Sequence, residues 1–267
     1  MTVTLTRVGY CHERAWLADR SSLFRSVRFP AMVAVIRHPS MGTILFDTGY
    51  GCALESAVAA RLYRRVLPFT LPDRERIGSR LQQLQVAQID HIFLSHFHPD
   101  HIGGLRELTG AKPIWHSRDG LSRLRALKGL AIKRAAFFEE LLPGDFATRA
   151  RAIEDLPLVA CHGMGAGHDL SGDGSIVAVA LPGHAAGQFG LMCRFPDGRR
   201  TFLCADAAWL RANIVDPKAR PAWPVRLIVD DFAAFNSTLD RLQELARDYP
   251  GVRIVPSHCE ESIGPLD

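Results

Sequence analysis

Residues 94–104, LSHFHPDHIGG, gather three histidines and an aspartate within six consecutive positions. These four residues are His96, His98, Asp100 and His101. The residues just before them, IDHIFLS (89–95), form an apolar run of the length of a short buried strand, which would end at the cluster. Imidazole and carboxylate groups this close together are typical of a metal site. The chain must therefore fold so that a strand delivers these side chains to a metal.

Three further potential ligands also follow apolar runs. His184 comes after VALPG, Asp206 after TFLCA and His258 after RIVPS. Loops at strand ends commonly carry functional groups above a rigid sheet. Together the strand ends offer five His and two Asp, which exceeds the needs of one four-coordinate zinc and suits two metals that share a ligand. Donors without thiolate fit Zn²⁺, and also Mn²⁺, Fe²⁺ or Co²⁺.

Strand and helix patterns alternate along both halves of the chain. The pairs 31–38 with 43–49 and 189–195 with 201–206 read as hairpins, the second joined by the turn sequence PDGRR. Further strands are predicted at 175–181 and 252–258, and helices at the following ranges: 53–64, 76–86, 121–142 and 231–251. This pattern predicts an α/β (α+β) domain whose sheets are covered by helices.

Composition narrows the classes of protein to consider. No run approaches 18 apolar residues, which argues against a transmembrane helix, and the first residues lack the apolar segment of a secretory signal. The six cysteines form no CxxC pair and read as reduced thiols, so a cytoplasmic location is expected. A formal charge of +4 is too small to demand nucleic acid or a membrane as partner.

The motifs resemble a known family. SHFHPDH matches the HxHxDH signature of the metallo-β-lactamase superfamily, and ILFDTG, PGHAAGQ, CAD and PSH resemble its remaining motifs in the same order across 43–258. The resemblance implies an αββα sandwich of two mixed sheets flanked by helices, formed by one domain over 1–267. Within the superfamily the chain is most similar to the quorum-quenching N-acyl homoserine lactonases.

The resemblance also implies roles for individual residues. It assigns one zinc to His96, His98 and His184, the other to Asp100, His101 and His258, and the bridge between them to Asp206. Asp47 in FDTG resembles the aspartate that orients metal-bound histidines. The lactonases usually carry a tyrosine three residues after the bridging aspartate, where this chain has Trp209. An indole donates one hydrogen bond but cannot accept or transfer a proton.

The segment between His101 and His184 is expected to shape the substrate pocket. Its basic, amphipathic part reads as a helical cap inserted around 119–145. The predicted walls of the pocket are Tyr50, Trp209, Phe137 and Phe138.

The predicted function is the hydrolysis of a small lactone or carboxylic ester by a hydroxide held between two metals, with Asp100 or Asp206 carrying the proton. A homodimer is compatible with the family resemblance. The residues leave three alternatives open. These are a phosphodiesterase or organophosphate hydrolase, an iron-dependent sulfur dioxygenase with a single metal, and a metal-stabilised binding module without turnover.

Overall fold

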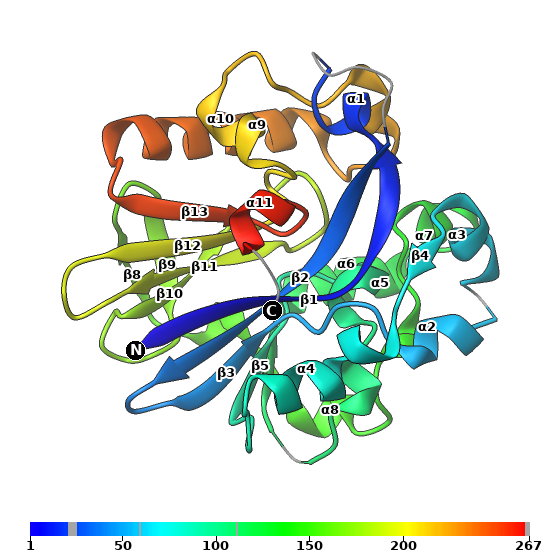
Figure 1. Ribbon diagram of the computed structural model, residues 1–267, viewed down its shortest axis with the longest axis horizontal. Coiled ribbons are helices and arrows are strands. Elements are labelled where there is room, and N and C mark those ends of the chain that lie inside the picture. The colour runs from blue at the N-terminus through cyan, green and yellow to red at the C-terminus, as the bar shows by residue number, and fades with distance from the viewer. Residues whose placement is uncertain (21–25, 59, 111, 265–267) are drawn as a thin grey trace.

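Two β-sheets lie face to face, and helices cover both outer faces (Figure 1). The computed structural model describes residues 1–267 apart from 21–25, 59, 111 and 265–267. This αββα arrangement confirms the predicted fold. Helices belong on the outside because each sheet is apolar on both faces, and only one face can be buried against the other sheet.

Within the described residues, the first sheet has seven strands in the order β4-β1-β2-β3-β5-β6-β7. Their bounds are β1 (Thr2–Arg14), β2 (Ser26–His38), β3 (Gly42–Phe46), β4 (Phe69–Thr70), β5 (His91–Phe93), β6 (Ile114–His116) and β7 (Ala150–Ala152). The pairs from β4 to β3 are antiparallel, whereas β3, β5, β6 and β7 run parallel to one another. The first sheet is therefore mixed.

Within the same residues, the second sheet has six strands in the order β13-β12-β11-β10-β9-β8. Their bounds are β8 (Leu158–Cys161), β9 (Gly165–Asp169), β10 (Ile176–Ala180), β11 (Phe189–Arg194), β12 (Arg200–Ala205) and β13 (Val252–Pro256). Only β12 and β13 pair in parallel. Both predicted hairpins are confirmed, since β2 pairs with β3 and β11 pairs with β12.

Short helices connect the strands. The α-helices are α1 (Ala15–Ala18), α2 (Cys52–Ser56), α3 (Arg61–Val66), α4 (Ile77–Gln83), α5 (Pro99–Ile102), α6 (Arg118–Ala126), α7 (Leu130–Arg134), α8 (Phe146–Arg149), α9 (Arg211–Val215), α10 (Phe232–Asp248) and α11 (Glu260–Ile263). The 3₁₀ helices are η1 (Asp73–Glu75), η2 (Leu105–Glu107), η3 (Glu139–Leu141), η4 (Ile153–Asp155) and η5 (Trp223–Leu227). None of the described helices is long and apolar enough to cross a membrane.

Two predicted helices are each divided in the structure. The range 53–64 becomes α2 and α3, and residue 59 between them lies outside the described residues. The range 121–142 becomes α6, α7 and η3. Helix α6 stops before Leu127, whose ψ of 146° is extended, and Gly129, with a φ of 58°, lies outside the right-handed helical region before α7 begins.

Alternation along β2 shows how the layers are built. Met32, Ala34 and Ile36 face the core between the sheets, together with Leu191 and Leu203 of the second sheet. The intervening Val33 and Val35 instead pack under the helices of the first sheet. On the far side, α10 covers the second sheet (Figure 1), with its leucines packed on β10–β12 residues. A strand buried on both faces reads as a continuous apolar run, as β2 does.

The strand ends set the position of the functional residues. The 96–101 segment follows β5, and His184 lies in the loop after β10. Asp206 follows β12 directly, and His258 lies two residues beyond the end of β13. Both sheets thus contribute loops to one edge of the sandwich.

Candidate metal centre

The structure brings all seven predicted ligands together. Their ligand atoms form three groups, each lying within 4.8 Å of one another: His96, His98 and His184; His96, His101 and Asp206; Asp100, His101 and His258. The groups overlap, because His96 and His101 each belong to two of them. The ligands therefore form one elongated cluster with a three-histidine end and a carboxylate-rich end.

Local backbone conformation explains how one short segment reaches both ends. His98 is extended, with φ −70° and ψ 153°, and caps the amino end of α5. Pro99 then occupies the first helical position, where its fixed φ suits a helix and its missing N–H costs nothing. Asp100 and His101 follow inside the helix. The change from extended to helical backbone separates His98 from the two ligands that come after it.

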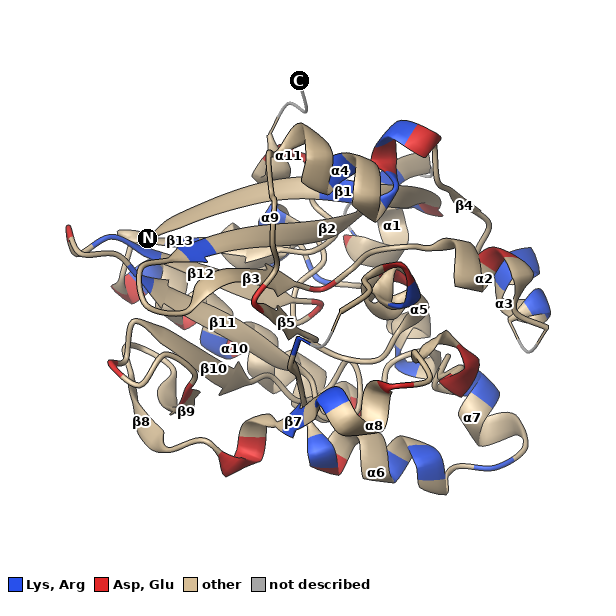
Figure 2. Ribbon diagram, turned by 90° about the horizontal axis from the view of Figure 1, so that it is seen from below, with Lys and Arg blue, Asp and Glu red and all other residues tan. Residues whose placement is uncertain are grey.

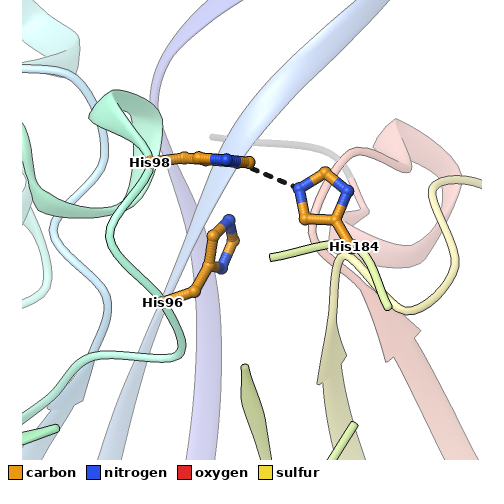
Figure 3. Close-up of side chains that lie close together, drawn as sticks. All are labelled: His96, His98 and His184. Carbon is orange, nitrogen blue, oxygen red and sulfur yellow. Dashed lines mark hydrogen bonds between the residues drawn. The ribbon is translucent and has the colours of Figure 1, made fainter. Parts of the chain in front are cut away.

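The three-histidine end is shown in Figure 3. Nε2 of His184 and Nδ1 of His98 lie 3.0 Å apart, and the ring of His96 lies 4.6 Å from that of His98 and 5.1 Å from that of His184. Burial lowers the pKa of all three rings, for His184 to about 3. The rings are therefore neutral at pH 7, as a metal ligand must be.

Asp206 lies between the two ends of the cluster. Its Oδ2 is 2.8 Å from Nε2 of His258 and 3.3 Å from Nε2 of His184, and its Oδ1 is 3.4 Å from Nε2 of His101. Although burial disfavours its ionised form, His258, His101 and His184 hold the pKa of Asp206 well below its usual value. A carboxylate in this position can serve both ends of the cluster at once.

Carboxylates dominate the electrostatics of the second end. Burial alone would lower the pKa of His101 and His258. Asp206 and Asp100 outweigh burial and raise the pKa of both rings, with Asp47 adding to the effect at His101. This end therefore favours positive charge, which protons or a cation can supply.

Hydrogen bonds on the far side of three rings fix their tautomers. His101 donates from Nδ1 to Oδ2 of Asp47 at 2.8 Å, and His258 donates from Nδ1 to the Pro30 carbonyl at 2.8 Å. The Ser95 hydroxyl donates to Asp47 at 2.8 Å, so it can accept from Nδ1 of His96 at 3.0 Å. Each ring is thereby left with a lone pair on Nε2, which is the arrangement that supports a metal ligand.

Unpartnered buried atoms test whether the residues fit a metal. Among the described residues, Nε2 of His96, Nε2 of His101 and Oδ1 of Asp206 are all buried without a hydrogen-bond partner. Buried polar atoms are rarely left unsatisfied, because the loss of water costs roughly 1–3 kcal/mol for each group. Three such atoms in one cluster of imidazole and carboxylate donors fit divalent cations.

A cavity of about 210 Å³ opens beside the three-histidine end. It is lined by Phe97, His98, Leu124, Leu127, Ala131, Arg134, Ala135, His184, Ala185, Ala186, Ile228, Val229 and Asp230. The 119–145 segment contributes α6 and α7 to this lining, and residues 228–230 also line it. The cavity is largely apolar, and its lining includes two candidate metal ligands, His98 and His184.

The four predicted pocket residues lie elsewhere. Phe137 and Phe138 are buried in the core beneath the first sheet, and neither lines the cavity. Tyr50 is buried in the same core and stacks on Phe69, with ring centroids 4.5 Å apart. Trp209 lies edge-on to His184, with ring centroids 6.0 Å apart, but is itself 7% exposed and also outside the cavity lining.

Sequence reasoning missed two groups that hold the ligands. The Ser95 hydroxyl could have been noticed, because it directly precedes His96 and follows the strand. The Pro30 carbonyl has no signal in the sequence, since any residue carries one. Of the histidines left outside the predicted site, His116 is buried against Phe97 and His162 is exposed in the turn between β8 and β9.

The chain matches a known protein family over most of its length. The family model described as the metallo-beta-lactamase superfamily matches residues 27–258. The chain belongs to the metallo-β-lactamase superfamily. The match includes the HxHxDH motif and every other candidate ligand. Two mixed sheets flanked by helices are accordingly the metallo-β-lactamase fold.

Solved structures share this metallo-β-lactamase fold over nearly the whole chain. An N-acyl homoserine lactone hydrolase with the product N-hexanoyl-L-homoserine at its catalytic metal centre gives a TM-score of 0.73 at 17% identity, covering 97% of this chain and 93% of that one. A probable metal-dependent hydrolase from Staphylococcus aureus gives 0.70 at 13% identity, covering 97% and 89%. The dizinc quorum-quenching lactonase AidC gives 0.63 at 17% identity, covering 96% and 87%. At these identities the likeness establishes the fold.

Proposed function

We propose that this chain is a dinuclear metal-dependent hydrolase that opens a small lactone or carboxylic ester. The observation that carries the proposal is the continuous cluster of candidate ligands with a shared carboxylate and, among the described residues, three buried donor atoms without a hydrogen-bond partner. One cation would be held by His96, His98 and His184, and the other by Asp100, His101 and His258. Asp206 would bind both cations. Zn²⁺ is the cation we expect, because all donors are imidazole or carboxylate groups.

The protein's own groups would prepare the reaction. Divalent cations bound by such donors lower the pKa of water towards about 7 and polarise a carbonyl oxygen. Asp47 and the Pro30 carbonyl hold the rings of His101 and His258 with Nε2 facing the cluster. These partners keep the ligands oriented before substrate arrives, so little reorganisation is needed during the reaction.

Asp100 is the candidate for moving a proton to the leaving group. Its side chain is 11% exposed, against 3% for Asp206, and its Oδ2 lies 3.5 Å from Nε2 of His258. Asp206 is enclosed by ligands on both sides and is better placed to bridge. Trp209 cannot substitute for either carboxylate, because an indole N–H does not transfer protons.

The cavity supports a small organic substrate. Its lining combines apolar side chains with His98 and His184, so an acyl group can lie against α6–α7 and residues 228–230 while its carbonyl reaches the cluster. Burying the acyl group also excludes water from the reacting end of the cavity. The relatives that act on N-acyl homoserine lactones have the same fold and support this substrate class.

The test is a comparison of metal content and substrate range. Zinc per chain is measured for the natural protein, for His98→Ala and for His162→Ala, which is a matched control because His162 is exposed and outside the cluster. Hydrolysis is then assayed on an acyl homoserine lactone, a p-nitrophenyl ester and a p-nitrophenyl phosphodiester.

We expect two metals per chain, loss of at least one in His98→Ala, and turnover of the lactone or ester by the natural protein and by His162→Ala. Full metal content in His98→Ala would contradict the ligand assignment. Turnover confined to the phosphodiester would replace the proposed reaction with phosphoester hydrolysis.

A further inference from the structure

The lining of the cavity beside the ligand cluster has a polar part and an apolar part. His98 and His184 belong to the ligand cluster, and most of the other lining side chains are apolar, among them Leu124, Leu127 and Val229. Its lining also contains two charged side chains, Arg134 of α7 and Asp230. Arg134 is exposed, so it stands where the cavity meets solvent. A bound acyl chain would therefore run from the histidines towards this opening.

Asp230 already has a cationic partner. Arg123 of α6 donates from Nη1 and Nη2 to both carboxylate oxygens of Asp230, at 2.8 and 3.0 Å. The backbone N–H of Asp230 also donates to the His184 carbonyl at 3.0 Å, which fixes this residue against the cluster. Such a two-bond pair satisfies the carboxylate and leaves little net charge at this point of the wall.

Among the described residues, Arg134 has no such anionic partner. It donates from Nη2 to the Arg226 carbonyl at 3.1 Å, which links α7 to η5. A carbonyl is neutral, and no carboxylate of the described residues lies within ion-pairing distance of Arg134. A guanidinium offers five N–H donors in a planar fork, so most of its donors remain for a ligand.

A second exposed guanidinium lies close to Arg134. Figure 2 shows Lys and Arg residues along α6 and α7, where Arg123 and Arg125 of α6 are paired with Asp230 and Glu139. Arg226 is held nearby over the ring of Trp223, at 5.5 Å from the ring centroid. Like charges clustered at a cavity mouth attract ligands of the opposite sign.

We propose that the natural substrate is an ester or lactone whose acyl chain ends in an anionic group, and that Arg134 binds this group. This inference rests on the proposed function, and it deepens it by naming the substrate class. The scissile carbonyl lies at His98 and His184, the methylene chain lies against the apolar walls, and the terminal anion pairs with the Arg134 guanidinium. Arg134 is thus a specificity residue that takes no part in bond cleavage.

The test compares esters that differ only in terminal charge. The substrates are the mono-p-nitrophenyl ester of adipic acid, p-nitrophenyl hexanoate and p-nitrophenyl 6-aminohexanoate, with longer homologues to vary the reach. KM and kcat are measured for the metal-loaded natural protein, for Arg134→Gln and for Lys133→Gln. Lys133 is the matched control, because it is the adjacent exposed cation and does not line the cavity.

We expect KM to rise in the order anionic, neutral, cationic for the natural protein and for Lys133→Gln. An exposed ion pair changes affinity by roughly two- to fivefold, so a preference of this size should disappear in Arg134→Gln with kcat unchanged. Raising the salt concentration should weaken the preference in the natural protein, because exposed charges are screened. Equal KM for the three charges, or a preference that survives in Arg134→Gln, would overturn the inference.

A binding measurement separates this inference from the proposed function. If no ester or lactone is hydrolysed, the proposed reaction is wrong. The preference for a terminal anion is then measured by titration calorimetry with amides that are not cleaved. Adipamate should then bind more tightly than hexanamide to the natural protein, and equally in Arg134→Gln. Equal binding of the two amides to the natural protein would refute a role for Arg134 whatever the reaction is.

Discussion

Asp47→Asn tests whether the partners of the ligands control metal binding. Asp47 is fully buried and accepts three hydrogen bonds, from the Ser95 N–H at 2.7 Å, the Ser95 hydroxyl at 2.8 Å and His101 Nδ1 at 2.8 Å. Its φ of 58° is a left-handed conformation that Asn also accepts. The substitution therefore removes an acceptor and a charge without adding backbone strain.

The expected losses of stability and of metal affinity follow from these three hydrogen bonds. An amide has one accepting oxygen, so in either orientation its NH₂ faces a donor that Asp47 now satisfies. If that donor is His101 Nδ1, the ring must move its proton to Nε2 and loses the lone pair needed by a metal. A hydrogen bond to a charged group contributes about 1.5–3 kcal/mol, and we expect a loss of unfolding free energy of about 2–3 kcal/mol. Metal affinity should fall by roughly 10- to 100-fold.

The assay is zinc affinity by chelator competition, together with denaturant unfolding of the metal-free protein. Asp90→Asn is the control, because Asp90 accepts the Thr43 N–H at 2.8 Å at the opposite end of β3. It should leave zinc affinity unchanged. Natural zinc affinity in Asp47→Asn would refute the view that these hydrogen bonds hold His101 ready for a metal.

Three further substitutions test the fold around the site. Gln85→Gly should raise the unfolding free energy by roughly 0.5–1 kcal/mol, because Gln85 is exposed with φ 52°; no gain in denaturant midpoint would contradict this. Gly183→Ala should lower the unfolding free energy by about 3 kcal/mol and weaken zinc binding at His184, because the new Cβ would lie 2.1 Å from the Phe235 nitrogen. Unfolding like that of the natural protein would argue against this close approach. Leu239→Ala should lower the unfolding free energy, measured by chemical denaturation, by about 2–5 kcal/mol, since Leu239 is fully buried between α10 and the second sheet. A loss below about 1 kcal/mol would contradict this close packing.

The clustering of the candidate ligands was predictable because these residues lie where strand patterns stop. Apolar runs before His184, Asp206 and His258 mark strands, and the change to polar or small residues marks their ends. Apolar runs separated by short turn sequences also identified the hairpins, whose register follows from their short turns. The resemblance to the superfamily then supplied what strand patterns alone do not, namely that the two sheets stack and share an edge.

The walls of the cavity were harder to predict. The amphipathic pattern of 121–142 shows that one face is buried but not which surface covers it. Leu127 and Ala131, on either side of Gly129, both line the cavity. Beyond α7 the chain passes through Ala136, whose φ is 46°, and Phe137 and Phe138 pack in the core. Positions of this kind depend on contacts distant in sequence, and a local pattern does not record them.

Anomalous diffraction from zinc-loaded crystals tests the central claim most directly, because it locates metals without reference to activity. We expect two peaks per chain, one among His96, His98 and His184 and the other among Asp100, His101 and His258, with Asp206 reaching both. A single peak, or peaks away from these side chains, would contradict the account.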